Sequence, residues 1–234
     1  MSSIRDNLQA VHYQIATAAQ AMSRQAHDVT LLAVSKTFGI DAVLEAAAAG
    51  QRAFGENYVQ EAVDKIVAAK LQAPTLTLEW HFIGPIQSNK TRLIAEHFDW
   101  VHSVDREKIA HRLSEQRPSH LPPLNLCLQV NSSNEASKSG VQMADAIAVA
   151  RAISTLPAIR LRGLMAIPEP TNDFAVQRAA FADVRRLLAQ CVDAGIEMDT
   201  LSMGMSADLA AAIAEGATIV RIGSAIFGKR TYAK

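Results

Sequence analysis

The chain has 234 residues, of which 49% are hydrophobic and 20% charged, and its 23 basic side chains balance 23 acidic ones. Zero net charge gives no overall attraction to nucleic acid or anionic membranes, and the length fits one α/β barrel. The N-terminal residues lack the apolar segment of a secretory signal, and no stretch reaches the ~20 apolar residues that span a bilayer. We therefore expect a soluble, cytoplasmic protein with a single domain over residues 1–234.

One pattern recurs along the chain: a short apolar segment, a polar or glycine-containing turn, and a segment with helical periodicity. The chain opens with a helix, because Ile4, Leu8, Val11, Ile15 and Met22 fall on one face. The strands are predicted at residues 29–34, 52–55, 78–83, 100–103, 124–130, 160–165, 200–203 and 218–222. The helices between them are predicted at residues 41–50, 59–71, 90–98, 106–116, 143–155, 174–194 and 207–215.

Strands that alternate with helices throughout favour parallel pairing and closure. We therefore predict a single (β/α)8 TIM-type barrel with an extra N-terminal helix. An open, doubly wound sheet is the alternative, but it usually has fewer strands and a glycine-rich first turn, and no GxGxxG follows the first strand.

The two cysteines, Cys127 and Cys191, lie 64 positions apart, each in an apolar stretch. Their spacing fits no metal site, and we interpret both as buried, inert thiols. No metal is expected.

Polar residues follow several of the predicted strands at the carboxyl end, where such barrels place their chemistry. They occur in Ser35-Lys36-Thr37, Glu56-Asn57, His102-Ser103, Ser202-Met203-Gly204 and Arg221-Ile222-Gly223-Ser224. Lys36 is the most informative, because a lysine beside packed apolar side chains has a lowered pKa and can attack a carbonyl. The alternative is a lysine that extends from the barrel mouth into water.

The last two strand ends read LSMGMSADL and RIGSAIFG, at the positions that often bind phosphate in this fold. Their glycines allow close approach of backbone N–H groups to an anion, and a helix starting at Ser206 or Ala207 would favour negative charge. The same glycines could be ordinary turn residues. Arg221 lies within a central strand and needs hydrogen-bond acceptors, either Glu56 or a ligand. A reactive lysine with a phosphate site suggests an aldolase-like sugar-phosphate site or pyridoxal phosphate.

Several segments match one known family in order and spacing. They are LLAVSKTF (31–38), FGENYVQE (54–61), WHFIGPIQSNK (80–90), HSVDR (102–106), QVNSSNEASKSG (129–140), LRGLMAIP (161–168), LSMGMSADL (201–209) and RIGSAIFG (221–228). Through them the chain resembles the YggS/PROSC family of pyridoxal phosphate homeostasis proteins, whose barrel is related to that of alanine racemase. The resemblance implies a fold-type III barrel that binds pyridoxal 5′-phosphate.

The resemblance also implies individual roles. Lys36 would hold the cofactor as a Schiff base, and Asn57 would orient its ring. Ser202, Gly204, Gly223 and Ser224 would bind the phosphate. Arg221 would face the pyridine nitrogen and keep it unprotonated, and Met165 and Met203 would pack near the ring, although core packing explains both methionines equally well.

Amino-acid racemases of this kind add a second domain and a tyrosine base, and the chain departs from them there. Tyr58 and Tyr232 are the nearby candidates, and neither matches convincingly. The resemblance therefore implies a non-enzymatic, monomeric protein that buffers the cofactor or delivers it to apo-enzymes. A racemase-like enzyme without the second domain is the alternative. Lys138 is either a second amine at the barrel mouth or a solvated loop lysine. His81 and His102 are either ligand contacts or structural histidines.

Overall fold

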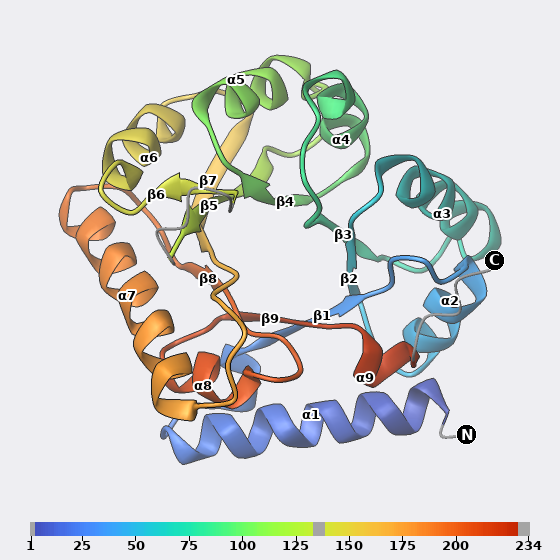
Figure 1. Cartoon of the computed structure of the whole chain (residues 1–234). Helices are drawn as coiled ribbons and strands as arrows, with labels where there is room; N and C mark the ends of the chain where they lie inside the picture. Colours follow the sequence, from blue (N-terminus) through green and yellow to red (C-terminus); the bar gives the residue numbers. More distant parts are fainter. Residues whose placement is uncertain (1–2, 133–138, 229–234) are drawn as a thin grey trace.

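The computed structural model describes residues 3–132 and 139–228. Its strands form a closed parallel barrel in the order β4-β3-β2-β1-β9-β8-β7-β5, completed by pairing of β4 with β5 (Figure 1). The ring strands are β1 (Thr30–Val34), β2 (Ala53–Glu56), β3 (Glu79–Phe82), β4 (Trp100–Val104), β5 (Leu124–Asn131), β7 (Ile159–Met165), β8 (Thr200–Ser202) and β9 (Ile219–Ile222). The short β6 (Val141–Gln142) pairs with β5 alone. The predicted barrel is confirmed.

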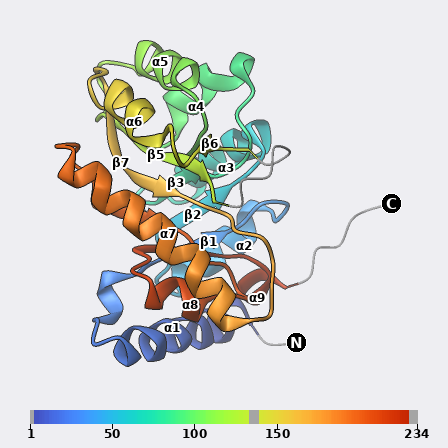
Figure 2. The same cartoon turned by 60° about the vertical axis from the view of Figure 1, so that its left-hand side comes forward.

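Helices surround the ring (Figures 1 and 2). The α-helices are α1 (Ile4–Ala21), α2 (Ile40–Ala48), α3 (Val59–Gln72), α4 (Thr91–His97), α5 (Glu107–Gln116), α6 (Ala146–Ser154), α7 (Phe174–Asp193), α8 (Leu209–Ala214) and α9 (Ser224–Phe227). Two single turns, η1 (Ala26–Asp28) and η2 (Ser88–Lys90), precede β1 and α4. Within the described ranges, no helix is long and apolar enough to cross a membrane.

The helix expected from Ser206 or Ala207 begins later, at Leu209. The Met205 N–H donates to the Asp208 carboxylate over 2.6 Å, and this bond holds the intervening residues in a turn. The prediction of a helix start at Ser206 or Ala207 was therefore wrong. Neither β6 nor α9 was expected, because two- and four-residue elements are too short for a periodic signal.

Apolar residues form two layers, one on each side of the strands. Alternate residues along each strand face outward to the helices, as Leu31 and Ala33 do on β1, within the main core. The intervening residues make a smaller cluster inside the barrel, namely Leu32, Ala53, Trp100, Cys127, Met165 and Ile219. This alternation has the period of two expected for β-strands.

Both cysteines are free and buried, as expected. Burial raises the pKa of the Cys127 thiol to about 12, so it stays protonated at neutral pH. No group of three or more histidine, cysteine or acidic side chains within the described ranges is placed to hold a metal ion.

Helix α1 packs against α8, α9 and α2, so it covers the barrel beside β9 and β1 (Figure 1). Ser3 caps its N-terminus, and its buried face consists of Leu8, Val11, Ile15 and Ala19. Met22, which the periodicity assigned to that face, lies past the helix end and is exposed. The side chain of Asn7 donates to the carbonyl of Ile226 over 2.8 Å and ties α1 to α9.

Candidate functional site

Strand register brings the predicted site residues to one part of the carboxyl-terminal rim. Val34 pairs with Gly55 across β1 and β2, so Lys36 and Asn57, two residues further along, follow in matching positions. On the other side of β1, Ala33 pairs with Ile222, directly before Gly223 and Ser224. Next in the ring come Ser202 on β8 and its register partner Met165 on β7. All eight predicted residues thus belong to five adjacent strands or the loops after them.

The backbone on each side of Lys36 is fixed by side chains of α3. Lys65 Nζ donates to the carbonyl of Ser35 over 2.9 Å, and the Thr37 N–H donates to Glu61 Oε1 over 2.7 Å. Thr37 has a φ of 70°, a left-handed conformation that needs support from its surroundings. These two bonds supply it, and they restrict the direction in which the lysine leaves the strand.

Glu56, Glu61 and Lys65 form an outer charged cluster between the barrel wall and α3. Lys65 Nζ lies 2.6 Å from Glu56 Oε1 and 2.7 Å from Glu61 Oε1, and the Ser35 hydroxyl donates to Glu56 over 2.6 Å. The Glu56 side chain is completely buried, and burial, which outweighs the nearby Lys65, raises its pKa. Its second oxygen, Oε2, has no hydrogen-bond partner within the described part of the chain.

Arg221 lies inside the barrel, since Val220 and Ile222 on either side of it face outward into the main core. Its NH1 donates to the Ser202 carbonyl over 2.6 Å and to the Ser202 hydroxyl over 2.9 Å, while NH2 donates to the Ala166 carbonyl over 3.0 Å. Pairing with Glu56 was the wrong alternative, because that carboxylate is on the other face of the wall. Burial lowers the pKa of Arg221 to about 10, so the guanidinium remains charged at neutral pH.

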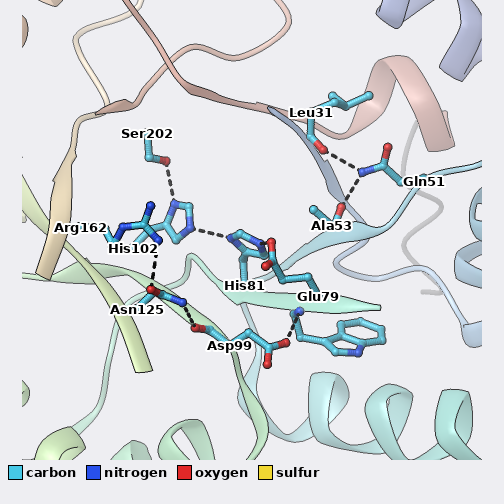
Figure 3. Close-up of polar contacts among 11 residues, drawn as sticks. Leu31, Gln51, Ala53, Glu79, His81, Asp99, His102, Asn125, Arg162 and Ser202 are labelled. Carbon is cyan, nitrogen blue, oxygen red and sulfur yellow. Dashed lines mark hydrogen bonds and ion pairs between the residues drawn. The ribbon is translucent and has the colours of Figure 1, made fainter. Parts of the chain in front are cut away.

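From Ser202, the partner of Arg221, a row of hydrogen bonds crosses the barrel interior, and Figure 3 draws its members Ser202, His102, His81 and Glu79. The Ser202 hydroxyl lies 2.7 Å from His102 Nδ1, and His102 Nε2 lies 2.8 Å from His81 Nδ1. His81 Nε2 lies 2.7 Å from Glu79 Oε1, at the amino-terminal end of β3. We call these four residues the inner chain. Burial lowers the pKa of His102 well below the usual histidine value, so His102 is neutral at physiological pH.

Two glycine-containing loops lie side by side on the same rim. Gly204 has a φ of 94°, and a Cβ there would come within 2.5 Å of Ala212 Cβ, so only glycine fits. Its carbonyl accepts the N–H of Arg221 over 2.9 Å, which joins the loop after β8 to β9. Gly223 and Ser224 begin α9, where a helix leaves its first N–H groups without partners in the helix. This geometry suits the approach of an anion.

Asn57 and Met165 lie at the two ends of this part of the rim. The side-chain oxygen of Asn57 is buried without a hydrogen-bond partner among the described residues. Gly84 packs so closely on the Asn57 backbone that a Cβ would lie 2.2 Å from its carbonyl oxygen. Met165 is buried in the cluster inside the barrel. An orphaned buried amide oxygen is expected where a bound ligand completes the site.

Sequence reasoning missed Lys65, and it named His81 and His102 as ligand contacts or structural histidines without linking them; their hydrogen bonds favour the structural alternative. Lys65 could have been noticed, because it occupies the apolar stripe of α3 with Ala62, Ile66 and Ala69 and lies four residues after Glu61. The alternation of His81 and His102 with apolar strand residues could have indicated the barrel interior, but not that the two rings meet. Tyr58 is 54% exposed at the start of α3. Lys138 and Tyr232 lie outside the described residues.

Comparison with known proteins agrees with this geometry. The sequence model described as the alanine racemase N-terminal domain matches residues 7–231. The chain is 62% identical to the pyridoxal phosphate homeostasis protein of Pseudomonas aeruginosa, over 99% of this chain and 98% of that protein. It is 53% identical to the protein of the same name from Escherichia coli, over the full length of both. The chain belongs to the pyridoxal phosphate homeostasis protein family.

Solved structures extend the comparison for this family member. PipY of Synechococcus elongatus, in a structure with pyridoxal phosphate bound, is 37% identical, with a TM-score of 0.83 and coverage of 97% of this chain and 100% of that one. An alanine racemase of Clostridium difficile has a TM-score of 0.75 at 14% identity, over 98% of this chain but 57% of the racemase. That second likeness shows the shared barrel fold.

Proposed function

We propose that this protein binds pyridoxal 5′-phosphate through Lys36 and acts in homeostasis of that cofactor by buffering or delivering it. The observation that carries the proposal is the convergence of Lys36, Arg221 and the two glycine loops on adjacent strands. The names of the relatives and the cofactor-bound PipY structure support the same conclusion. Cytoplasmic location, a monomeric state and apo-enzymes as recipients belong to the proposal.

The residues present fit the cofactor. Pyridoxal phosphate supplies an aldehyde that condenses with a lysine amine to form a C=N bond and release water, together with a dianionic phosphate and a pyridine ring. Lys36 lies between two peptide groups that side chains of α3 hold in place, which restricts the direction in which its side chain leaves the strand. Backbone N–H groups at Gly204, Gly223 and Ser224 would bind the phosphate. Ser202, the other residue predicted to bind it, ends β8, and its hydroxyl bonds to His102 and Arg221.

Arg221 would contact the pyridine nitrogen. A guanidinium only donates hydrogen bonds, so it can bind that nitrogen only while the nitrogen is unprotonated. This arrangement weakens the ring as an electron sink, which favours holding the cofactor over turning over an amino acid. Asn57, whose buried amide oxygen has no partner among the described residues, would help to orient the ring, and Met165 would pack below it.

Reduction with borohydride followed by peptide mass mapping tests the proposal. Protein incubated with pyridoxal phosphate should gain absorbance in the visible range, and the reduced adduct should be found on Lys36. The Lys36→Ala variant should show neither signal. An adduct confined to other lysines, or a protein that stays colourless, would exclude this site, and the latter result would favour the aldolase-like alternative.

A second experiment separates a carrier from a racemase-like enzyme. Loaded protein is incubated in heavy water with a panel of amino acids, and exchange of their α-protons is followed by NMR. We expect exchange no faster than with free pyridoxal phosphate. Fast exchange of one amino acid that requires Lys36 would make the protein an enzyme.

A further inference from the structure

The inner chain crosses a barrel interior that is otherwise mostly apolar. His81 and His102 are 1% and 0% exposed, and Ser202 is also 0% exposed. Each lies between outward-facing strand neighbours, level with the interior cluster that contains Trp100 and Cys127. Interiors of such barrels are usually filled by branched apolar side chains. A buried polar group destabilises the fold unless it is paired, so the presence of these polar residues in the barrel interior needs an explanation.

The groups at the two ends of the inner chain determine the direction of its hydrogen bonds. At one end Arg221 can only donate, and it donates to the Ser202 hydroxyl. At the other end the Glu79 carboxylate can only accept, so His81 Nε2 carries a hydrogen and donates to it. His81 Nδ1 then accepts from His102 Nε2, and His102 Nδ1 accepts from the Ser202 hydroxyl. Every proton has an acceptor, and both imidazoles are neutral Nε2–H tautomers.

The opposite direction is less favourable. It requires an extra proton on His81, a side chain that is 1% exposed, and it makes His102 donate to Ser202. The Ser202 hydroxyl would then accept from both His102 and Arg221, and its own hydrogen would lack an acceptor among residues 3–132 and 139–228. A buried donor without a partner destabilises the fold, so the first direction is the one that the structure favours.

The Glu79 end of the inner chain is open to solvent. Glu79, whose side chain is 49% exposed, borders a cavity of about 550 Å³ at the mouth of the barrel opposite the candidate site. His12 lines the same cavity but is not a member of the inner chain. The hydrogen bonds thus connect a solvent-facing carboxylate at one mouth to the guanidinium that lies just inside the other.

We infer that His81 and His102 are positioning residues, which fix the Ser202 hydroxyl as a donor to His102 and thereby hold the Arg221 guanidinium in place for the cofactor. Arg221 has three hydrogen bonds, two of them to Ser202. If the Ser202 hydroxyl turned, one of those bonds would weaken and the guanidinium could rotate. The inference rests on the proposed function only in assigning Arg221 to the cofactor. The direction of the hydrogen bonds in the inner chain does not depend on that function.

The first test uses the unloaded protein, so it is independent of cofactor binding. The protein contains seven histidines, and comparison with the spectra of His81→Gln and His102→Gln variants assigns the two that matter. Nitrogen-15 NMR at pH 7.5 should show both imidazoles neutral with the hydrogen on Nε2. A hydrogen on Nδ1 of His102, or a charged His81, would overturn the proposed direction whatever the protein binds.

The second test measures the dissociation constant and the absorbance spectrum of bound pyridoxal phosphate. His102→Leu removes the acceptor for Ser202, and we expect about ten-fold weaker binding with a shifted spectrum. His102→Gln keeps one acceptor and one donor at similar spacing and should restore both properties. His12→Gln, at the same cavity but outside the chain, should match the wild type.

Other outcomes distinguish this inference from the proposed function. Binding and spectrum unchanged in His102→Leu, with wild-type protein binding normally, would refute the positioning role alone. If His102→Leu fails to fold, His102→Gln and His81→Gln decide, since both should bind like the wild type while His81→Leu should not. If the wild type itself binds no pyridoxal phosphate, the proposed function fails, and the NMR result still tests the chain.

Discussion

The barrel wall separates two buried polar groups that are built in opposite ways. Outside it, the outer charged cluster joins Lys65 to Glu56 and Glu61 by ion pairs. Inside it, the inner chain links Glu79 to Ser202 through two histidine rings, which the inferred direction of hydrogen bonding makes neutral. The pKa of Glu56 is raised by burial, whereas that of Glu79 is lowered, chiefly by its hydrogen bond from His81. Opposite charges stabilise one group, and the direction of hydrogen bonding stabilises the other.

This difference matches what each group holds in place. The outer charged cluster fixes two peptide groups on either side of Lys36, and ion pairs are suited to such anchoring because they tolerate small shifts. The inner chain ends on Arg221, which is itself a buried cation. A second cation nearby would repel it, and neutral imidazoles avoid that repulsion while still setting orientation.

The largest effect should come from Lys65→Met. The substitution leaves Glu56 buried beside apolar atoms without its cation, and breaking a buried ion pair typically costs about 3–5 kcal/mol. Urea unfolding of the variant should show a loss of that size, and adding Glu56→Gln should recover a large part of it. Lys70→Met, at an exposed position of the same helix, is the matched control. A loss no larger than in that control would mean that the cluster does not anchor the Lys36 loop.

Breaking the inner chain should cost less, because no charge is left unpaired. His102→Leu leaves the hydrogen of the Ser202 hydroxyl without an acceptor and His81 Nδ1 without a donor, which is expected to reduce the free energy of unfolding by about 1–3 kcal/mol. His102→Gln should stay within about 1 kcal/mol of the wild type. If His102→Leu proved more destabilising than Lys65→Met, the comparison between the charged group and the neutral group would be reversed.

Sequence alone predicted the barrel, because glycine stops and apolar strand segments repeat in a fixed order. It also located the candidate site, since parallel strands end on one rim. It could not predict which buried groups meet across the barrel, because that depends on strand stagger. Register shifts occur between Val101 and Val104 of β4 and between Leu126 and Cys127 of β5. The first of these shifts lies beside His102, whose ring meets His81 and Ser202, and no local pattern encodes it.

The two glutamates should respond to pH in opposite directions. Glu56 binds its proton more strongly in the folded protein, so its contribution to stability is present below the ordinary glutamate pKa of 4.5 and is lost as pH rises through the raised value. Glu79 has a lowered pKa, so its contribution is present above 4.5 and is lost as pH falls through the lowered value.

Urea unfolding at a series of pH values, from about 3 to 7, measures this contrast. Compared with the wild type, Glu56→Gln should lose less stability as pH rises above 4.5, and Glu79→Gln should lose less as pH falls below it. Curves that change in the same direction in both variants would show that the two carboxyl groups do not differ in the way that their surroundings imply.

The smallest effect should come from Glu61→Gln. Its side chain is 34% exposed, and water screens the lost ion pair with Lys65, so we expect less than about 1 kcal/mol of lost stability. The amide oxygen still accepts from Thr37, so binding of pyridoxal phosphate should weaken by less than about five-fold. Asp64→Asn on the same helix is the control. A large loss of binding with unchanged stability would assign Glu61 a direct part in the site.

Helix α1 occupies the place on the barrel wall beside β9, where the closing helix α9 has only four residues. The ribosome makes α1 first, but two of its partners, α8 and α9, come last: Asn7 bonds to a carbonyl 219 residues later, and Arg24, just after the helix, bonds to one 189 residues later. Although α2 is made soon after it, α1 therefore lacks its contacts with α8 and α9 until synthesis is nearly complete. During translation, α1 cannot complete its packing until the C-terminal strands have been made. The barrel closes only when β9, near the end of the sequence, pairs with β1.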